Sequence, residues 1–287
     1  MSNNFDERGL DPKDRAAQNS SMGFTQTSDS PFSFVLPTEF VELPSKGKLY
    51  PPDHPLHDQE TVEIRHMTAK DEDILTSETL LRKGLAIERL LENVIINKEV
   101  KLDDLLIGDK NAIVVATRIT GYGPQYETKI RCPSCGENSE YEFDLRKGEI
   151  TDFEKNIEEL EIKRTEQNTF VVSLPAMKVD VEFRPLLGRD ERELSAAIEK
   201  RKKYKLPETV MTDQFRAFIC SVNAHKDFES INALIEHMPA SDARHLMRAY
   251  KKVLPDIDLT QEFICSSCSH QGPLEVPFTS DFFWPNR

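Results

Sequence analysis

Two stretches of the chain show the same order of apolar and polar positions. Val62–Leu75 aligns without gaps on Val181–Leu194, and Val, Glu, Arg, Asp, Glu and Leu coincide in the two stretches. Upstream, Val41–Pro44 matches Val172–Pro175, and downstream each stretch is followed by a Cys-x-x-Cys pair. Three landmarks in the same order predict that the chain contains two related halves.

Each half begins with the period-two pattern of strands and continues with the spacing of helices. The strands are expected around Val62 and Val181, each preceded by an extended segment with a Leu-Pro pair. Thr68 with Asp71 three residues later is an N-cap signature for a short first helix. Further helices are predicted at residues 85–96, 109–121, 190–203, 209–222, 230–237 and 241–253. The predicted fold class is α+β, with two duplicated strand-helix units joined by a four-cysteine zinc-knuckle centre.

The patterns divide the chain into four parts. Residues 1–37 are rich in Ser, Asn, Asp and Gln without apolar periodicity, which predicts a disordered N-terminal arm. Residues 38–148 are the first repeat and 169–287 the second, and each contains its Cys-x-x-Cys hairpin. Residues 149–168 are predicted to be a charged connector with a short helix, and an aromatic tail follows the second hairpin.

The cysteine pairs are the strongest chemical signal in the chain. Cys132 and Cys135 form one pair, Cys265 and Cys268 the other, and each lies between two short extended runs. Two thiolates separated by two residues can bind one tetrahedral ion, and four fill a structural zinc site without leaving a position for water. We predict one structural zinc per chain. Spacing alone leaves open whether both pairs share the ion.

Two other interpretations of these cysteines are unpaired thiols and a redox disulfide. A thioredoxin-like Cys-x-x-Cys opens a helix, whereas Gly136–Tyr141 is turn-like and leads into a strand. The fifth cysteine, Cys220, has no nearby partner in sequence, and such thiols suit a reducing cytoplasm. The zinc interpretation is therefore favoured.

Charge and composition limit the remaining classes of function. The chain has 287 residues and a formal net charge of −13, which argues against an extended phosphate-binding face. It lacks an apolar run of the roughly 18 residues that a membrane span needs, and its first residues do not resemble a signal peptide. We therefore expect an intracellular protein that neither spans a membrane nor binds nucleic acid. The run Lys200–Lys205 is interpreted as a solvated helix end.

The first half carries a longer connection than the second between its Leu-Pro pair and its strand. Most of the extra length lies in Ser45–His57, whose prolines reduce its freedom in the unbound state. We expect the loop to expose Leu49 and Tyr50 to a partner, although a merely rigid connection is the alternative. The arm residues between Pro31 and Pro37 either bind a partner or pack on their own domain. The candidate partner-binding residues are Lys46, Lys48, Leu49, Tyr50, Phe32 and Phe34.

Signatures of catalysis are absent from the sequence. It contains no glycine-rich phosphate loop, no His-Glu-x-x-His and no Gly-x-Ser-x-Gly. The carboxylate pairs lie near predicted helix starts, where negative charge is favoured without any catalytic role. We therefore predict that the protein is not an enzyme.

Several short motifs of the first half resemble the T4-like bacteriophage baseplate hub protein family. They are Leu43–Pro51, Met67-Thr68, Leu81–Gly84, Gly108-Asp109, Arg118, Tyr122–Tyr126 and Cys132–Cys135. The resemblance covers about Thr38 to Gly148, and the second half adds mainly its cysteine pair and the ending at Phe282–Pro285.

The resemblance implies a late structural or assembly protein of the hub of a contractile tail, acting through contacts with other baseplate and tail proteins. It also implies a location in the host cytoplasm during assembly or in the baseplate of the virion. Two further classes fit parts of the pattern: a zinc-ribbon protein that binds nucleic acid or regulates, and an assembly chaperone that is absent from the mature virion.

Overall fold

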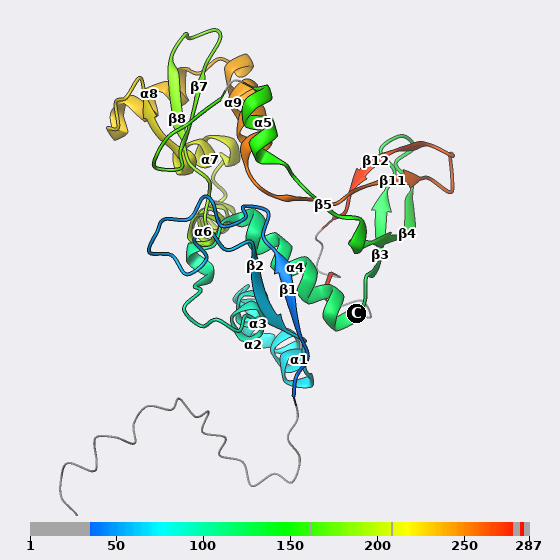
Figure 1. The fold of residues 1–287 in the computed structure, drawn as a ribbon. Coiled ribbons are helices and arrows are strands. Elements are labelled where there is room, and N and C mark those ends of the chain that lie inside the picture. Colours follow the sequence, from blue (N-terminus) through cyan, green and yellow to red (C-terminus); the bar gives the residue numbers. More distant parts are fainter. Residues whose placement is uncertain (1–34, 161, 208, 278–281, 284–287) are drawn as a thin grey trace, which may run out of the picture. The chain divides into compact units, whose positions relative to one another are not determined.

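The computed structural model describes residues 35–160, 162–207, 209–277 and 282–283. The chain divides into the units Met1–Val35 and Leu36–Arg287, and all helices and strands named here belong to the second (Figure 1). The strands are β1 (Thr38–Glu42), β2 (Thr61–Arg65), β3 (Gln125–Arg131), β4 (Asn138–Asp144), β5 (Glu149–Ile150), β6 (Lys163–Arg164), β7 (Phe170–Ser173), β8 (Asp180–Phe183), β9 (Ile219–Val222), β10 (Ile257–Asp258), β11 (Thr260–Ile264) and β12 (Gln271–Glu275). The α-helices are α1 (Ala69–Thr76), α2 (Glu78–Arg82), α3 (Ala86–Val94), α4 (Ile107–Tyr122), α5 (Phe153–Glu159), α6 (Gly188–Lys203), α7 (Val210–Phe218), α8 (Phe228–His237) and α9 (Ala240–Val253), with short 3-10 turns at η2 (Leu102–Asp104) and η3 (Leu145–Lys147).

The first half is built on an antiparallel pair of strands. β1 pairs with β2 in a register that places Val41 opposite Val62, and both side chains are buried. Helix α3 buries Leu90, Leu91 and Val94 on one face, which is the spacing that its sequence predicts. Helix α4 ends at Tyr122 and is followed by Gly123, whose φ of 82° is accessible to glycine at little steric cost.

The second half contains an antiparallel sheet with the strand order β6-β7-β8-β9. Its core is aromatic: Phe183 lies near Phe170 and Phe218, and Phe218 stacks on Tyr250 with 4.1 Å between ring centroids. The predicted helix 209–222 is too long, because α7 ends at Phe218 and the chain continues as β9. Pairing with β8 accounts for the difference, because a distant strand overrides the local helical spacing.

The two halves share an arginine–aspartate motif between strand and helix. In the first half, Arg65 donates two hydrogen bonds to Asp71, at 2.7 and 2.9 Å, and Asp71 also accepts the backbone N–H of Thr68 at 2.8 Å. In the second half, Arg184 donates to Asp190 at 2.7 and 2.8 Å, and Asp190 accepts the N–H of Leu187 at 2.8 Å. The sequence alignment pairs these residues with one another, so equivalent positions have the same geometry.

A second shared feature is a buried aspartate at the third position of a helix. Asp109 in α4 accepts the backbone N–H of Ser45 at 2.9 Å, and Asp242 in α9 accepts those of Ala176 and Met177 at 3.1 and 2.9 Å. Ser45 and Ala176 each follow the Leu-Pro pair of their half. In both halves, a helix precedes the cysteine hairpin, and an aspartate at the start of that helix accepts hydrogen bonds from the backbone that follows the Leu-Pro pair. That the halves arose by duplication stays a prediction.

The halves meet through close backbone contacts. Leu106 and Leu187 form an isolated antiparallel bridge, and the N–H of Gly188 donates to the carbonyl of Leu105 at 2.9 Å. A Cβ on Gly188 would lie 2.2 Å from the carbonyl oxygen of Leu102, so this approach requires glycine.

The segment between the halves contributes two strands and a helix. β5 pairs with β10, β6 pairs with β7, and Asn156 in α5 donates to the carbonyl of Lys252 at the end of α9. Within the described residues, no helix combines the length and the apolar character needed to cross a bilayer.

Candidate metal centre

Two β-hairpins bring the cysteine pairs together. β3 pairs with β4 and β11 with β12, and the two registers are equivalent, with Arg131 opposite Asn138 and Ile264 opposite Gln271. The hairpins lie side by side in Figure 1, and the Tyr141 hydroxyl donates to the carbonyl of Glu262 across them at 2.8 Å. Segments that are distant in sequence therefore meet at one place.

Each hairpin tip forms the same turn around its first cysteine. The N–H of Gly136 donates to the carbonyl of Cys132, and the N–H of Ser269 donates to that of Cys265, both at 2.9 Å. The residue after the second cysteine lies in the left-handed region in both turns, with φ of 77° at Gly136 and 57° at Ser269. Glycine takes this conformation without strain, whereas serine does so at a cost.

The four thiol sulfurs form a compact cluster. The Sγ atoms of Cys132, Cys135, Cys265 and Cys268 all lie within 4.8 Å of one another. The Cys132–Cys268 and Cys135–Cys265 sulfurs are each 3.8 Å apart. Zinc–thiolate bonds of about 2.3 Å in a tetrahedron place the sulfurs about 3.8 Å apart, so the donor set fits one structural zinc ion.

Hydrogen bonds around the cluster favour the thiolate at Cys132. Backbone N–H groups of Cys135 and Ser134 donate to Cys132 and lower the pKa of its thiol to about 6. At Cys135 the backbone N–H of Glu137 lowers the pKa of the thiol, but contacts with the other cysteine side chains outweigh it and raise that pKa. Cys132 and Cys265 are buried, whereas Cys135 and Cys268 are exposed. Cys220 does not belong to the cluster, and its burial raises the pKa of its thiol.

Aromatic side chains hold the two hairpins against each other. Tyr141 packs edge-on against Phe143 and Phe263, with centroids 4.9 and 5.2 Å apart. Gln261 donates to the carbonyl of Asp144 at 2.8 Å and accepts the N–H of Asp144 at 3.3 Å. The relative position of the cysteine pairs is thus set by protein contacts as well.

A buried arginine, Arg118, connects α4 to the end of the chain. Its guanidinium donates to the carbonyls of Phe282, Gly123 and Gln125 at 2.6, 2.9 and 3.2 Å, and burial lowers its pKa. Phe282 is buried and packs edge-on against Tyr126, at 5.1 Å between centroids. Phe283 is buried as well, whereas Trp284 lies outside the described residues.

The loop Ser45–His57 differs from its prediction. Leu49 and Tyr50 are 6% and 1% exposed, so the expectation that the loop exposes them is wrong. The reason is a network around Asp109, which accepts hydrogen bonds from the Ser45 hydroxyl at 2.6 Å and from the Tyr50 hydroxyl at 2.8 Å. The Tyr50 oxygen in turn accepts the N–H of Leu106 at 3.1 Å. Desolvation raises the pKa of Asp109 and of Tyr50, so the loop is anchored in the core.

The two lysines of this loop remain at the surface. Lys46 is exposed, and Lys48 forms an ion pair of 2.8 Å with Glu154 in α5. Their role in binding a partner stays a prediction. Phe32 and Phe34 lie outside the described residues.

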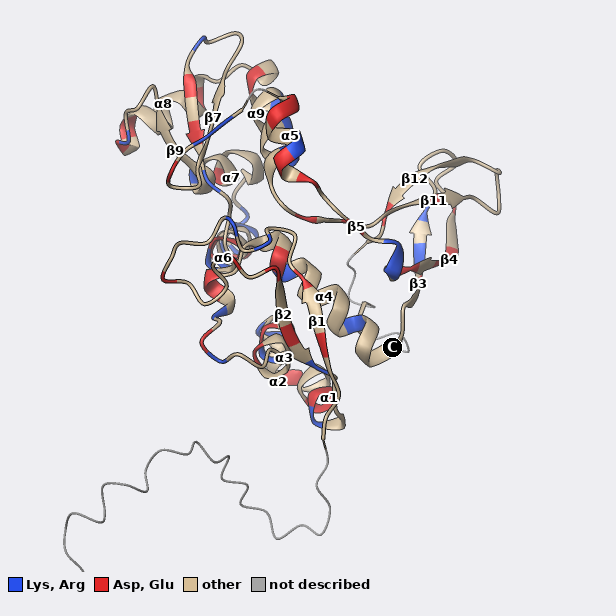
Figure 2. Cartoon of the chain, viewed as in Figure 1, with Lys and Arg blue, Asp and Glu red and all other residues tan. Residues whose placement is uncertain are grey.

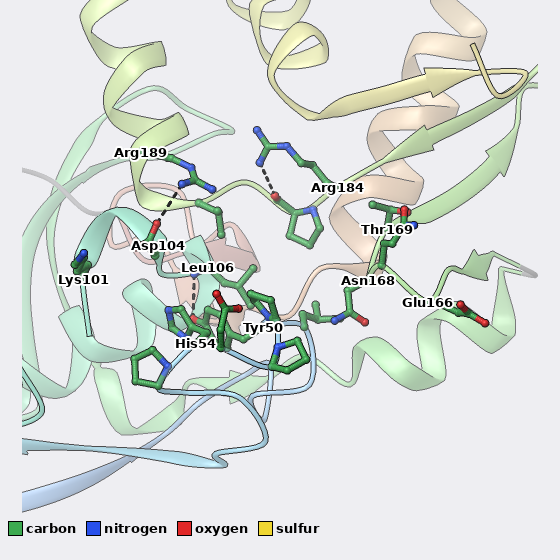
Figure 3. Close-up of a pocket in the computed structure, with 18 of the residues that line it drawn as sticks. Tyr50, His54, Lys101, Asp104, Leu106, Glu166, Asn168, Thr169, Arg184 and Arg189 are labelled. Carbon is green, nitrogen blue, oxygen red and sulfur yellow. Dashed lines mark hydrogen bonds and ion pairs between the residues drawn. The ribbon is translucent and has the colours of Figure 1, made fainter. Parts of the chain in front are cut away.

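The loop also forms one wall of a cleft of about 1170 Å³. Figure 3 shows Tyr50 and His54 on one side and Arg184 and Arg189 on the other. Both arginines are already paired, Arg184 with Asp190 and Arg189 with Asp104. These two arginines of the cleft therefore already have carboxylate partners.

The fold and the site define a class of protein: an α+β scaffold with a four-cysteine cluster between two halves. The family model described as T4 bacteriophage base plate protein matches residues 37–284, and the chain belongs to that family. It is a baseplate structural protein, and this membership points to a role without catalysis. No curated protein and no solved structure matches the chain.

Proposed function

We propose that the protein is a subunit or assembly factor of the baseplate hub, in which one zinc ion joins the two halves of the chain. The observation that carries the metal part is the set of four sulfurs with the spacing of a tetrahedral zinc site. Zinc held by four thiolates has no open position for water, so the site stabilises the fold and supplies no reaction centre.

Structural zinc matters here because the ligands come from both halves of the folded unit. The two sulfurs of each closest pair are separated by 136 and 130 residues along the chain. An ion bound by both hairpins keeps the first half attached to the second, which suits a protein that transmits contacts in a large assembly.

The hub part of the proposal is supported by the family and by the first-half motifs. The surface of the anchored loop, with Lys46 and the exposed segment Pro51–Asp53, is proposed as a contact for another hub or tail protein. Anchoring by Tyr50 holds this surface in one conformation, which lowers the entropic cost of binding.

The metal part is tested by native mass spectrometry of the purified chain, together with absorption spectra after cobalt substitution. We expect one metal per chain and the spectrum of four thiolate ligands. Two metals per chain, or a spectrum with oxygen or nitrogen ligands, would contradict the shared zinc.

The hub part is tested by quantitative mass spectrometry of purified particles and of assembly intermediates from infected cells. We expect the protein in complexes that contain central baseplate components. Its presence in intermediates but not in finished particles would indicate an assembly chaperone, and its association only with peripheral baseplate components would exclude the hub.

A further inference from the structure

Strand β1 has an outer edge that faces away from β2. The N–H of Leu43 donates to the carbonyl of Glu60, and the N–H of His66 donates to that of Pro37, which fixes which residues of β1 face β2. In an antiparallel ladder the groups alternate, so the backbone N–H and C=O of Thr38, Phe40 and Glu42 point outward. Among the described residues, none of these outward groups has a backbone partner.

The second half shows what covers the equivalent edge. β7 and β8 pair in the same register as β1 and β2, with Val172 opposite Val181 and the N–H of Leu174 donating to the carbonyl of Val179. There the outer edge of β7 is occupied by β6, which places Lys163 opposite Val171. Val171 is the residue that corresponds to Phe40. In the second half, a third strand therefore occupies the edge that corresponds to the outer edge of β1.

The side chains at the open edge indicate what kind of strand fits. Phe40 is 66% exposed and lies opposite Glu63 of β2. On the other side of β2, the N–H of Ile96 donates to the carbonyl of Glu63, and Ile96 is 40% exposed. Glu39 and Glu42 are also exposed, and Figure 2 shows the acidic residues of β1 in red. The strand at the corresponding edge, β6, consists of a lysine and an arginine.

We propose that the outer edge of β1 docks an extended, basic segment of another protein, which adds to the sheet as a third strand. Backbone hydrogen bonds to Thr38, Phe40 and Glu42 supply affinity, as in other cases of strand addition. An apolar residue opposite Phe40 packs on its ring, and Lys or Arg residues opposite Glu39 and Glu42 supply charge complementarity. This site is separate from the zinc centre and from the loop of the proposed hub contact.

An open edge has another explanation, in which β1 is simply protected from aggregation. Short strands, flanking prolines and charged side chains all discourage pairing. β1 has five residues, lies between Pro37 and Pro44, and carries two glutamates. This explanation predicts that no strand adds to the edge, so an experiment separates it from docking.

The probe is a short labelled peptide built around the block Lys-Val-Val-Lys, which places lysines opposite Glu39 and Glu42 and a valine opposite Phe40 in either strand direction, and its control is a peptide of the same length built around Glu-Val-Val-Glu. The full chain is titrated with each peptide, and amide exchange is followed by NMR. We expect saturable binding of the lysine peptide and new protection at Thr38, Phe40 and Glu42, whereas Glu39 and Val41 are protected with and without peptide. The glutamate peptide should bind at least about tenfold more weakly.

Phe40→Pro tests the backbone contacts directly. The N–H that proline removes points away from β2, so the ladder between β1 and β2 keeps its bonds and the melting temperature should change little. Binding of the lysine peptide should fall at least about tenfold. As a second variant, Glu39→Lys combined with Glu42→Lys should reverse the preference between the two peptides.

Three results would overturn the proposal: no saturable binding of either peptide, equal binding of both peptides, or binding that Phe40→Pro leaves unchanged. Outward amides of β1 that are protected without peptide, with protection rising with protein concentration, would show that a second copy covers the edge instead. These outcomes do not depend on metal content or on hub association, so failure here leaves the proposed function standing.

Discussion

The two halves of the unit are most alike at their cysteine hairpins and least alike at the outer edge of their first strands. Both have the same hairpin register, the same knuckle hydrogen bonds and a buried aspartate at the third position of the preceding helix. The second half, however, covers the edge of β7 with its own β6, whereas no strand among the described residues pairs with the outer edge of β1, and the first half adds the loop at Ser45–His57. Features common to both halves serve folding, and features present in one half are free to serve partners.

The largest expected effect tests whether the metal centre belongs equally to both halves. Cys132→Ser and Cys265→Ser should each abolish metal binding and lower stability by several kcal/mol, since structural zinc contributes on the order of 10 kcal/mol to folding. Metal content and calorimetric melting measure this, with Cys220→Ser as the matched control because that thiol lies outside the cluster. Metal retained by one single mutant but not by the other would show that the halves do not share the ion.

The next effect compares the two arginine–aspartate pairs. Asp71→Ala should destabilise the protein by about 3 kcal/mol, because it leaves Arg65 without its partner in a partly buried site. Asp190→Ala should cost less, because the Arg184 side chain is 34% exposed and that of Arg65 only 21%. Urea unfolding measures both, and an equal or reversed order would contradict the ranking.

The same pair predicts a dependence on pH. Burial alone would raise the pKa of Asp71, but hydrogen bonds from Arg65 and from the N–H and hydroxyl of Thr68 lower it to about 2. A carboxyl with a lowered pKa stabilises the folded state above its unfolded pKa of about 3.9 and loses that contribution as the pH falls towards 2. Asp71→Asn should flatten the loss of stability between about pH 4 and pH 2, relative to the wild-type chain.

A smaller effect tests the anchor that only the first half has. Tyr50→Phe removes the hydroxyl that donates to Asp109 and accepts from Leu106, so we expect a loss of about 1–3 kcal/mol. Tyr204→Phe is the control, because Tyr204 is 61% exposed. If both variants melt alike, the network around Asp109 does not hold the loop.

The smallest effect concerns the one position at which the two knuckles differ in strain. Ser269→Gly should stabilise the protein by about 0.5–1 kcal/mol, because glycine adopts the left-handed conformation of the turn without a Cβ penalty. Gly136→Ser should destabilise it by a similar amount. Chemical denaturation of the metal-loaded chain measures both, and shifts of the same sign would show that the turns are not equivalent.

Local signals in the sequence predicted much of this fold. The Thr68 and Asp71 pattern predicted the start of α1, and the strand spacing around the cysteines predicted both hairpins. The clustering of four cysteines was also predicted from their matching contexts. Each of these rests on residues that are close in sequence or repeated in both halves.

Contacts between distant residues could not be predicted in the same way. Tyr50 and its partner Asp109 are 59 residues apart, and nothing in the proline-rich loop indicates that its aromatic side chain turns inward. The role of Arg118 was missed for the same reason, because its partner Phe282 is 164 residues away. β9 was predicted as helix because its apolar residues continue the spacing of α7, and only pairing with β8 distinguishes the two states.

The distance between the cysteine pairs along the chain has a consequence for synthesis. At ribosomal rates of 5–20 residues per second, the 130 residues that separate Cys135 from Cys265 take between about 6 and 26 seconds to add. During that interval the nascent chain offers only two of the four cysteines of the cluster, and two thiolates hold zinc far less firmly than four. A chain truncated before Cys265 would lack half of the ligands, so firm retention of zinc would distinguish chains that contain both hairpins from truncated ones.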